Sequence, residues 1–318
     1  MKLTDHFIDL TGPGCHGKYA RPEAVGGVLS RIGATLRDAV RMSVLHSSRR
    51  VGRPMSELSH AWHIRSGGQT AGPDQATRLL FKAPTLKDAA PALFDQGLLW
   101  EDGPNPEDTA FDLMGAVLRD VARQKRDSQW YDVDLLNRIG RFSGVLQRGV
   151  NQIQLGGHQL EARSTPAINR LLTDAAKTLV TETPEPRRTR MTGMLDMIRV
   201  SDRVFELVLK DGQRARAVWV RHEVVELAKY LNSDVTIEGK AVFRPSGGLL
   251  RMEAEAIAKA GEKDRHFSVM PRPAQPMGRR AGVSVELKRG ESPFAAIYGK
   301  WPGEESDAEV RAALEEIS

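Results

Sequence analysis

The sequence contains very little cysteine and no long apolar run. Its one cysteine, Cys15, excludes an intramolecular disulfide framework and a cysteine-rich zinc site. A chain with so little cysteine is typical of the reducing cytoplasm. No apolar run approaches the roughly 18–20 residues that a membrane span requires, and residues 1–10 lack the apolar core of a signal peptide. We therefore expect a cytoplasmic protein without a membrane partner.

Aromatic residues and net charge are also low. Aromatics make up 6% of the chain, so platforms on which nucleic-acid bases stack are scarce. The formal net charge is only +5, from 46 Lys and Arg against 41 Asp and Glu. This excess permits contact with nucleic acid but does not require it. Basic residues are dense in 187–290, whereas the end of the chain is mostly acidic, so a basic stretch precedes an acidic tail.

The length of 318 residues predicts two domains, at about 100–200 residues per domain. The stretch TETPEPRRT separates them, because it is rich in proline and charge and has no hydrophobic periodicity. The expected divisions are an irregular N-terminal segment (1–22), a mixed α/β domain (23–180), a linker (181–190), a small β-barrel (191–258), an extended basic segment (259–298) and an acidic docking tail (299–318).

The first domain is expected to be mostly helical with a few strands. After Pro22, a favourable first residue for a helix, apolar residues recur at helical spacing up to Val44. In the rest of the domain, alternation around a turn at Gly156 and Gly157 predicts a hairpin within 150–163. The further elements predicted are helices at 86–96, 106–124, 133–148 and 166–180, and strands at 61–65 and 76–82.

The second domain is predicted to be a small β-barrel with the element order β-β-β-α-β-β. Asp211 and Gly212 form a strong hairpin signal between the second and third strands. Helical spacing within 222–231 predicts a short helix before the fourth strand, which Gly239 interrupts. Five strands with a helix between the third and fourth are typical of an OB-fold. The alternative is an SH3-like or other small barrel, and the fold class in either case is α+β.

The acidic tail combines an aromatic residue with a short predicted helix. Residues 306–309 fit a capping box, and Val310, Leu314 and Ile317 share one face of the helix that follows. A helix of about 11 residues is marginal alone in water, so we expect it to dock on this chain or on a partner. Trp301 is the accompanying anchor for a protein partner. Packing of Trp301 onto the first domain is the alternative.

Arginines of the barrel are the main candidates for nucleic-acid contact. OB barrels bind single strands with positive charge and aromatic platforms, but Phe205 and Trp219 lie among apolar residues and are expected in the core. A second basic patch follows the first long helix, where it would equally complement the helix dipole. A solvated basic surface is the alternative for the barrel. The candidates are Arg199, Arg203, Arg214, Arg216, Arg221, Arg244 and Arg251 in the barrel, and Arg49, Arg50 and Arg53 in the second patch.

No residue pattern supports a catalytic site strongly. Glu286 and Lys288 have the E-x-K spacing of metal-dependent nucleases, but that spacing is common by chance. The motif also needs a second acidic ligand on a neighbouring strand, and the sequence around it is irregular. His60 and His63 lack the carboxylate cluster that would complete a metal site. We therefore expect no metal and no cofactor, and the sequence favours a protein that is not an enzyme.

Three stretches resemble an uncharacterised bacterial protein family with no known activity. They are residues 106–113 (PEDTAFDL), residues 195–199 (LDMIR) together with 244–247 (RPSG), and residues 299–305 (GKWPGEE). The resemblance implies a bacterial protein with the layout given above. The tail is also similar to the ends of small bacterial proteins, some of them encoded near toxin–antitoxin genes.

The function expected first is that of a non-enzymatic adaptor or regulator that acts through protein–protein contacts, in a toxin–antitoxin or phage-defence setting. The missing catalytic pattern and the tail that must dock motivate this expectation. One alternative is a nucleic-acid-binding protein that uses the barrel arginines. The other is a metal-dependent nuclease that uses Glu286 and Lys288.

Overall fold

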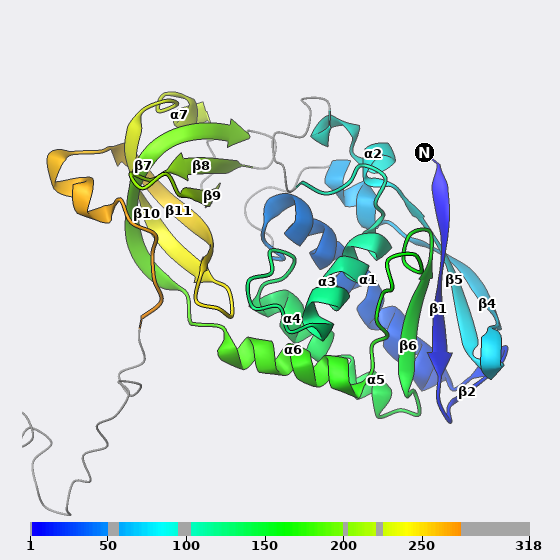
Figure 1. The fold of residues 1–318 in the computed structure, drawn as a ribbon. Coiled ribbons are helices and arrows are strands. Elements are labelled where there is room, and N and C mark those ends of the chain that lie inside the picture. Colours follow the sequence, from blue (N-terminus) through cyan, green and yellow to red (C-terminus); the bar gives the residue numbers. More distant parts are fainter. Residues whose placement is uncertain (1, 50–56, 95–102, 200–202, 221–224, 275–318) are drawn as a thin grey trace, which may run out of the picture. The chain divides into compact units, whose positions relative to one another are not determined.

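The computed structural model describes residues 2–49, 57–94, 103–199, 203–220 and 225–274. Its N-terminal part contains an antiparallel sheet whose strands pair in the order β4-β5-β1-β6 (Figure 1). The strands of this part are β1 (Leu3–Thr11), β4 (Arg65–Ala71), β5 (Thr77–Pro84) and β6 (Gln152–Gly157), with a small ribbon of β2 (Cys15–His16) and β3 (Tyr19–Ala20) beside them.

Strand β1 lies in the interior of this sheet, between β5 and β6. The prediction that residues 1–22 are irregular is therefore wrong. His6, Ile8 and Leu10 are buried at every second position of the strand, and Asp9 on its other face is buried in an ion pair with Arg78. Gly12 and Pro13, which suggested irregular structure, begin only after the strand has ended.

Helices α1, α3, α4 and α6 lie on one side of the sheet (Figure 1). Val28, Ile32 and Leu36 follow one another at four-residue spacing along α1, and all three are buried in the core that also contains Ile8 of β1. The helix that the periodicity after Pro22 predicts is thus confirmed. The helices are α1 (Pro22–Leu45), α2 (Leu86–Ala89), α3 (Ala110–Ala122), α4 (Val133–Gly140), α5 (Ser143–Leu146), α6 (Arg170–Glu182) and α7 (Val225–Ala228).

Several elements of this part differ from the prediction. The sheet makes the domain a mixed α/β structure that is not clearly mostly helical. The hairpin expected within 150–163 does not form, because β6 ends at Gly157 and residues 158–165 make a loop instead of a returning strand. Gly156 of β6 allows the ring of Phe7 on β1 to lie close to the backbone of β6. A Cβ atom on Gly156 would lie 2.2 Å from that ring.

The second part is a closed five-stranded barrel, as predicted. Its strands pair in the order β10-β11-β9-β8-β7, and β7 closes the barrel against β10. The pair of β9 and β11 is parallel, whereas the other pairs are antiparallel. Helix α7 falls between the third and fourth strands. The strands are β7 (Arg187–Arg199), β8 (Val204–Val208), β9 (Arg214–Trp219), β10 (Asp234–Phe243) and β11 (Leu249–Lys259).

The glycines and aromatic residues that the sequence analysis singled out in the barrel have the structural roles predicted for them. Gly212 has a φ of 81°, the left-handed conformation that a tight hairpin turn requires. Gly239 lies at a register shift of β10, which is a β-bulge. Phe205 and Trp219 are both buried in the barrel core, which confirms that they are core residues.

The remaining boundaries are only partly described. Helix α6 extends to Glu182 and β7 begins at Arg187, so the connection is shorter than the linker expected at 181–190. A 3-10 turn (Glu262–Phe267) occupies the start of the segment expected to be extended. Residues 275–318, which include the docking tail, lie outside the described residues. Within the described ranges, no helix has the length and apolar character needed to span a membrane.

Candidate anion-binding cleft of the barrel

Barrel arginines bind backbone carbonyl groups at the end of helix α1. The last carbonyls of a helix have no partner within it and carry the negative end of the helix dipole. Arg199 donates a hydrogen bond to the carbonyl of Val44 at 3.2 Å. Arg251 donates to the carbonyl of His46 at 2.9 Å, where the chain leaves the helix with a φ of 51°. The dipole argument made for Arg49 therefore applies to arginines far away in the sequence.

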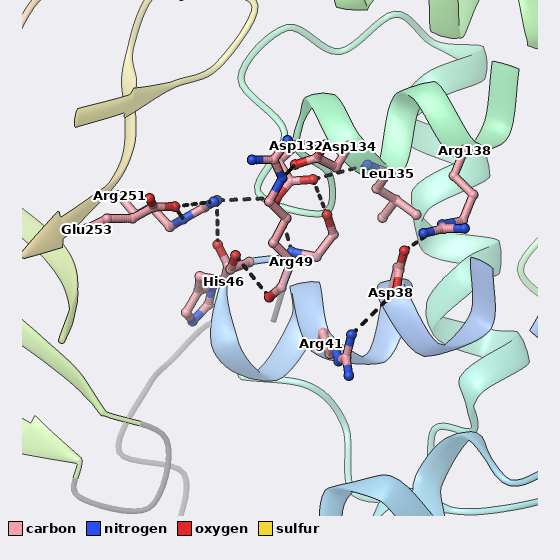
Figure 2. Close-up of polar contacts among 12 residues, drawn as sticks. Asp38, Arg41, His46, Arg49, Asp132, Asp134, Leu135, Arg138, Arg251 and Glu253 are labelled. Carbon is pink, nitrogen blue, oxygen red and sulfur yellow. Dashed lines mark hydrogen bonds and ion pairs between the residues drawn. The ribbon is translucent and has the colours of Figure 1, made fainter. Parts of the chain in front are cut away.

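Arg251 also bridges to the start of helix α4, as Figure 2 shows. Its guanidinium lies 3.3 Å from the carboxylate of Asp132, and both side chains are 3% exposed. Asp132 is the N-cap of α4 and accepts hydrogen bonds from the backbone of Leu135 and from Ser48. Glu253 accepts a further bond from Arg251 at 2.8 Å. One buried arginine thus joins the barrel to two helices.

His46 lies buried in the middle of these arginines. Its Nδ1 atom is 3.1 Å from the guanidinium of Arg216, which can only donate, so this ring nitrogen acts as the acceptor. Burial lowers the pKa of His46 well below 6.5, and the surrounding arginines lower it further. The arginines with this effect are Arg216, Arg199, Arg251 and Arg244. The imidazole of His46 is therefore neutral and is surrounded by positively charged side chains.

A second layer of ion pairs joins α1 and the segment that follows it to α4 (Figure 2). Asp38 of α1 is buried and accepts a hydrogen bond from Arg138 of α4 at 2.5 Å. Arg49 donates to Asp134 in the first turn of α4 at 2.8 Å. Arg49, one of the candidates for nucleic-acid contact, is therefore engaged within the protein.

A cleft of about 470 Å³ opens on the barrel, and it shares Arg216 and Arg244 with the cluster around His46. Its walls come from β8, β9 and the turn between β10 and β11, and Gln129 contributes from the loop after α3. The charged side chains that line it are Arg214, Arg216, Arg244 and Glu206. Three arginines and one glutamate give the lining an excess of positive charge, which favours the binding of an anion.

Arg244 is an arginine of the cleft whose hydrogen-bonding capacity is not filled by the described residues. Its side chain is half-buried, and its Nε atom has no hydrogen-bond partner among the described residues. Burial lowers the pKa of Arg244, and Asp127 opposes that effect only through its charge. Arg214, in contrast, is exposed and donates to Asp196 at 3.0 Å and to Glu206 at 3.5 Å.

The structure thus gives different positions to the described arginines that were predicted in the barrel. Arg199 and Arg251 hold the helices, while Arg214, Arg216 and Arg244 line the cleft. Arg203 lies at the start of β8 with a φ of 62°, and its carbonyl accepts a hydrogen bond from the backbone of Trp219. The predicted residues outside the described ranges are Arg50, Arg53, Arg221, Glu286, Lys288, Trp301, Val310, Leu314 and Ile317.

The residues that the first part of the chain contributes to this site were not predicted from the sequence. Asp132 stands before the apolar run of α4, and this N-cap pattern was visible in the sequence. His46 and Gln129 gave no such signal, because only the tertiary fold brings them to the barrel. His60 and His63 lie with ring centres 5.9 Å apart. In the part of the chain that is described, no three His, Cys, Asp or Glu side chains are grouped to hold a metal ion.

Comparison with known proteins identifies no relative. No protein-family model, no curated protein and no solved structure matches the chain. The resemblance to a bacterial family and the adaptor role therefore remain predictions, and function has to be argued from the cleft itself.

Proposed function

We propose that the protein binds single-stranded nucleic acid through its phosphates, in the cleft lined by Arg214, Arg216 and Arg244. The position of these three arginines on one face of the barrel is the observation that carries this proposal. Phosphate oxygens are bound most often by arginine, whose planar guanidinium offers several donors at once.

The barrel topology supports this assignment. The closed five-stranded order, the parallel pair of β9 and β11 and the helix between the third and fourth strands together favour an OB-like barrel. OB barrels hold oligonucleotides on the face of their second and third strands and at the loop between the last two. The equivalent elements here are β8, β9 and residues 244–248, and the cleft is lined by these same elements.

The chemistry of the cleft favours the nucleic-acid backbone over the bases. Among the described residues, the lining of the cleft contains no aromatic side chain, and Phe205, Trp219 and Phe243 of the barrel strands are buried. Base stacking therefore has no platform in the cleft, and affinity would come from charge. Binding of this kind shows little dependence on base sequence and falls steeply with salt. The volume of about 470 Å³ is in the range of pockets for small ligands, which suits one or two nucleotides rather than a duplex.

Binding of short labelled oligonucleotides at low salt tests the proposal. The wild-type protein should bind single strands more tightly than the matching duplex. Arg244→Ala should weaken this binding about tenfold, because a charged hydrogen bond contributes about 1.5–3 kcal/mol. Arg190→Ala is the matched control, since Arg190 is an exposed barrel arginine that pairs with Glu238 and does not line the cleft.

No binding at low salt would overturn the proposal. Equal losses in Arg244→Ala and Arg190→Ala would also overturn it, because they would assign the effect to overall charge. Unfolding of both variants in denaturant checks that the barrel is intact.

A further inference from the structure

A second polar cluster is buried in the first part of the chain. It is made by strand β1, by the start of helix α3 and by the loop that follows β6. His158 of this loop donates from Nδ1 to the carboxylate of Asp112 at 2.8 Å. Asp112 is completely buried, whereas the side chain of His158 is 21% exposed. The cluster therefore reaches from the core to the surface, and the arginine cleft does not use it.

The hydrogen bonds of Asp112 fix the state of the His158 ring. One carboxylate oxygen, Oδ2, also accepts from the backbone of Thr109 at 2.9 Å and from its hydroxyl at 2.7 Å. Surrounded by donors, this oxygen acts as an acceptor, so the proton of the His158 ring resides on Nδ1. In the neutral form of the ring, the lone pair is then on the other nitrogen, Nε2. A histidine held in this way by a buried carboxylate is oriented to act as a base.

The buried ring of His6 is a second, independent indication that this cluster binds a further group. The side chain of His6 is 2% exposed, and among the described residues neither ring nitrogen has a hydrogen bond of good geometry, although the backbone of Gly156 lies close enough to oppose the fall of the His6 pKa. The ring stacks on Phe111 at a centroid distance of 4.5 Å and meets the edge of the His158 ring at 6.0 Å. The Oδ1 atom of Asp112 is also buried without a partner. Buried polar atoms rarely remain unpaired in proteins, and such atoms point to a ligand or an ordered water.

Arginines beside the cluster favour a negatively charged ligand. Arg163 lies 2.9 Å from the carboxylate of Asp108. Arg119, two turns along α3 from Asp112, is half-buried and donates to the hydroxyl of Thr165 at 3.1 Å. Arg119 forms no ion pair with any residue that the structure describes. Burial and the charge of Arg163 lower the pKa of Arg119, whereas Asp120 and Asp108 oppose this effect only through their charge, so this cation is only partly compensated.

We infer that this cluster is a hydrolytic site for phosphate esters, in which His158 is the general base. Asp112 is a positioning residue, because it acts only by orienting His158. Arg119 provides the positive charge that binds the phosphoryl oxygens and stabilises them as charge develops, whereas the charge of Arg163 is shared with Asp108. The inference is independent of the proposed nucleic-acid cleft, since the two sites share no residue.

The chemical step balances with water as the only co-reactant. Nε2 of His158 removes one proton from a water molecule while the water oxygen forms a new bond to phosphorus. The bond between phosphorus and the leaving oxygen breaks, and the leaving oxygen takes the bonding electron pair. The protonated His158 then returns its proton to the leaving oxygen, so the ring ends in its starting state.

Hydrolysis of bis(4-nitrophenyl) phosphate in buffer with EDTA tests the inference. We expect turnover by the wild-type protein, and a loss of at least about 100-fold in kcat/KM for His158→Gln. Asp112→Asn should lower kcat and shift the pH profile, because the ring would lose its fixed orientation. Arg119→Gln should raise KM more than it lowers kcat, because it removes charge that binds the substrate.

His16→Gln is the matched control, because His16 is exposed and the hydrogen bond that its ring makes is to the Pro13 carbonyl, away from the cluster. It should keep full activity, and unfolding in urea should show that every variant is folded. Two results would overturn the inference. One is the absence of turnover by the wild-type protein between about pH 5 and pH 9. The other is an activity of folded His158→Gln equal to that of the wild type.

Discussion

The guanidinium of Arg251 lies 3.3 Å from the carboxylate of Asp132, and both side chains are almost fully buried. Arg251 belongs to the last strand of the barrel, whereas Asp132 caps a helix of the first part of the chain. Val242 and Leu250 of the barrel join the apolar core of that first part. The connection between the two parts therefore combines a buried ion pair with apolar packing, and it gives the nearby arginines of the cleft a fixed frame.

Removal of Arg251 should be strongly destabilising. Arg251→Ala leaves Asp132 as a buried carboxylate without its cation, which costs about 3–5 kcal/mol of unfolding free energy. The control is Arg190→Ala, whose partner Glu238 lies 3.4 Å away with both side chains about half exposed. An exposed pair of this kind contributes less than about 1 kcal/mol. Unfolding in urea measures both values. Equal values for the two variants would show that the Arg251 pair does not join the parts.

Stability should fall in mild acid because of buried histidines. Burial lowers the pKa of His6 from 6.5 to about 4. The unfolded chain therefore gains a proton as the pH falls through 6.5, while the folded chain stays neutral until about pH 4. The stability is fully present above pH 6.5, and His6 alone should remove about 2 kcal/mol of it by pH 5. The pKa of His46 is also lowered, so its effect has the same sign.

The variant His6→Leu isolates the first of these effects. It removes one titrating group, so the loss of unfolding free energy between about pH 7 and pH 5 should shrink by about 2 kcal/mol. His46 should still cause part of the acid sensitivity. Urea unfolding at the two pH values gives the comparison. If wild type and His6→Leu lost the same stability over this interval, His6 would not be a buried neutral histidine.

Two glycines should respond in opposite directions to the same substitution. A Cβ atom on Gly239, at the bulge of β10, would lie 2.0 Å from the carbonyl oxygen of Glu253. Gly239→Ala should therefore destabilise the barrel by about 1–3 kcal/mol or more. Gly33 of α1 has no atom within 4 Å of the corresponding position. Gly33→Ala should stabilise the protein by about 0.5–1 kcal/mol, because alanine favours the helix. Thermal unfolding measures both effects. An unchanged melting temperature for Gly239→Ala would contradict the bulge geometry.

Much of the fold was readable from local patterns. The periodicity after Pro22 predicted α1, and the Asp211-Gly212 turn with the bulge at Gly239 placed the strands of the barrel. These signals are local, since each depends on residues close together in the sequence. Strand β1 was missed because its neighbours in the sheet, β5 and β6, lie far along the chain. The pair of glycines in β6 suggested a turn, although close approach to Phe7 is what requires Gly156.

The candidate site was readable only in part. Composition marked the barrel arginines, but it could not separate those that bind helix carbonyls from those that line the cleft. That separation depends on His46 and Asp132, which approach the barrel only in the folded chain. The polar cluster of His6, Asp112 and His158 escaped notice for the same reason. Its three residues come from distant segments, and no motif joins them in the sequence.

The salt dependence of oligonucleotide binding tests the central claim most directly. Each phosphate contact contributes about 0.7 to the slope of log K against log salt for a single strand. The wild-type protein should show a clear slope, and Arg244→Ala should reduce it by about 0.7. Arg190→Ala should leave it unchanged. An identical slope for the wild type and Arg244→Ala would contradict binding of nucleic acid in this cleft.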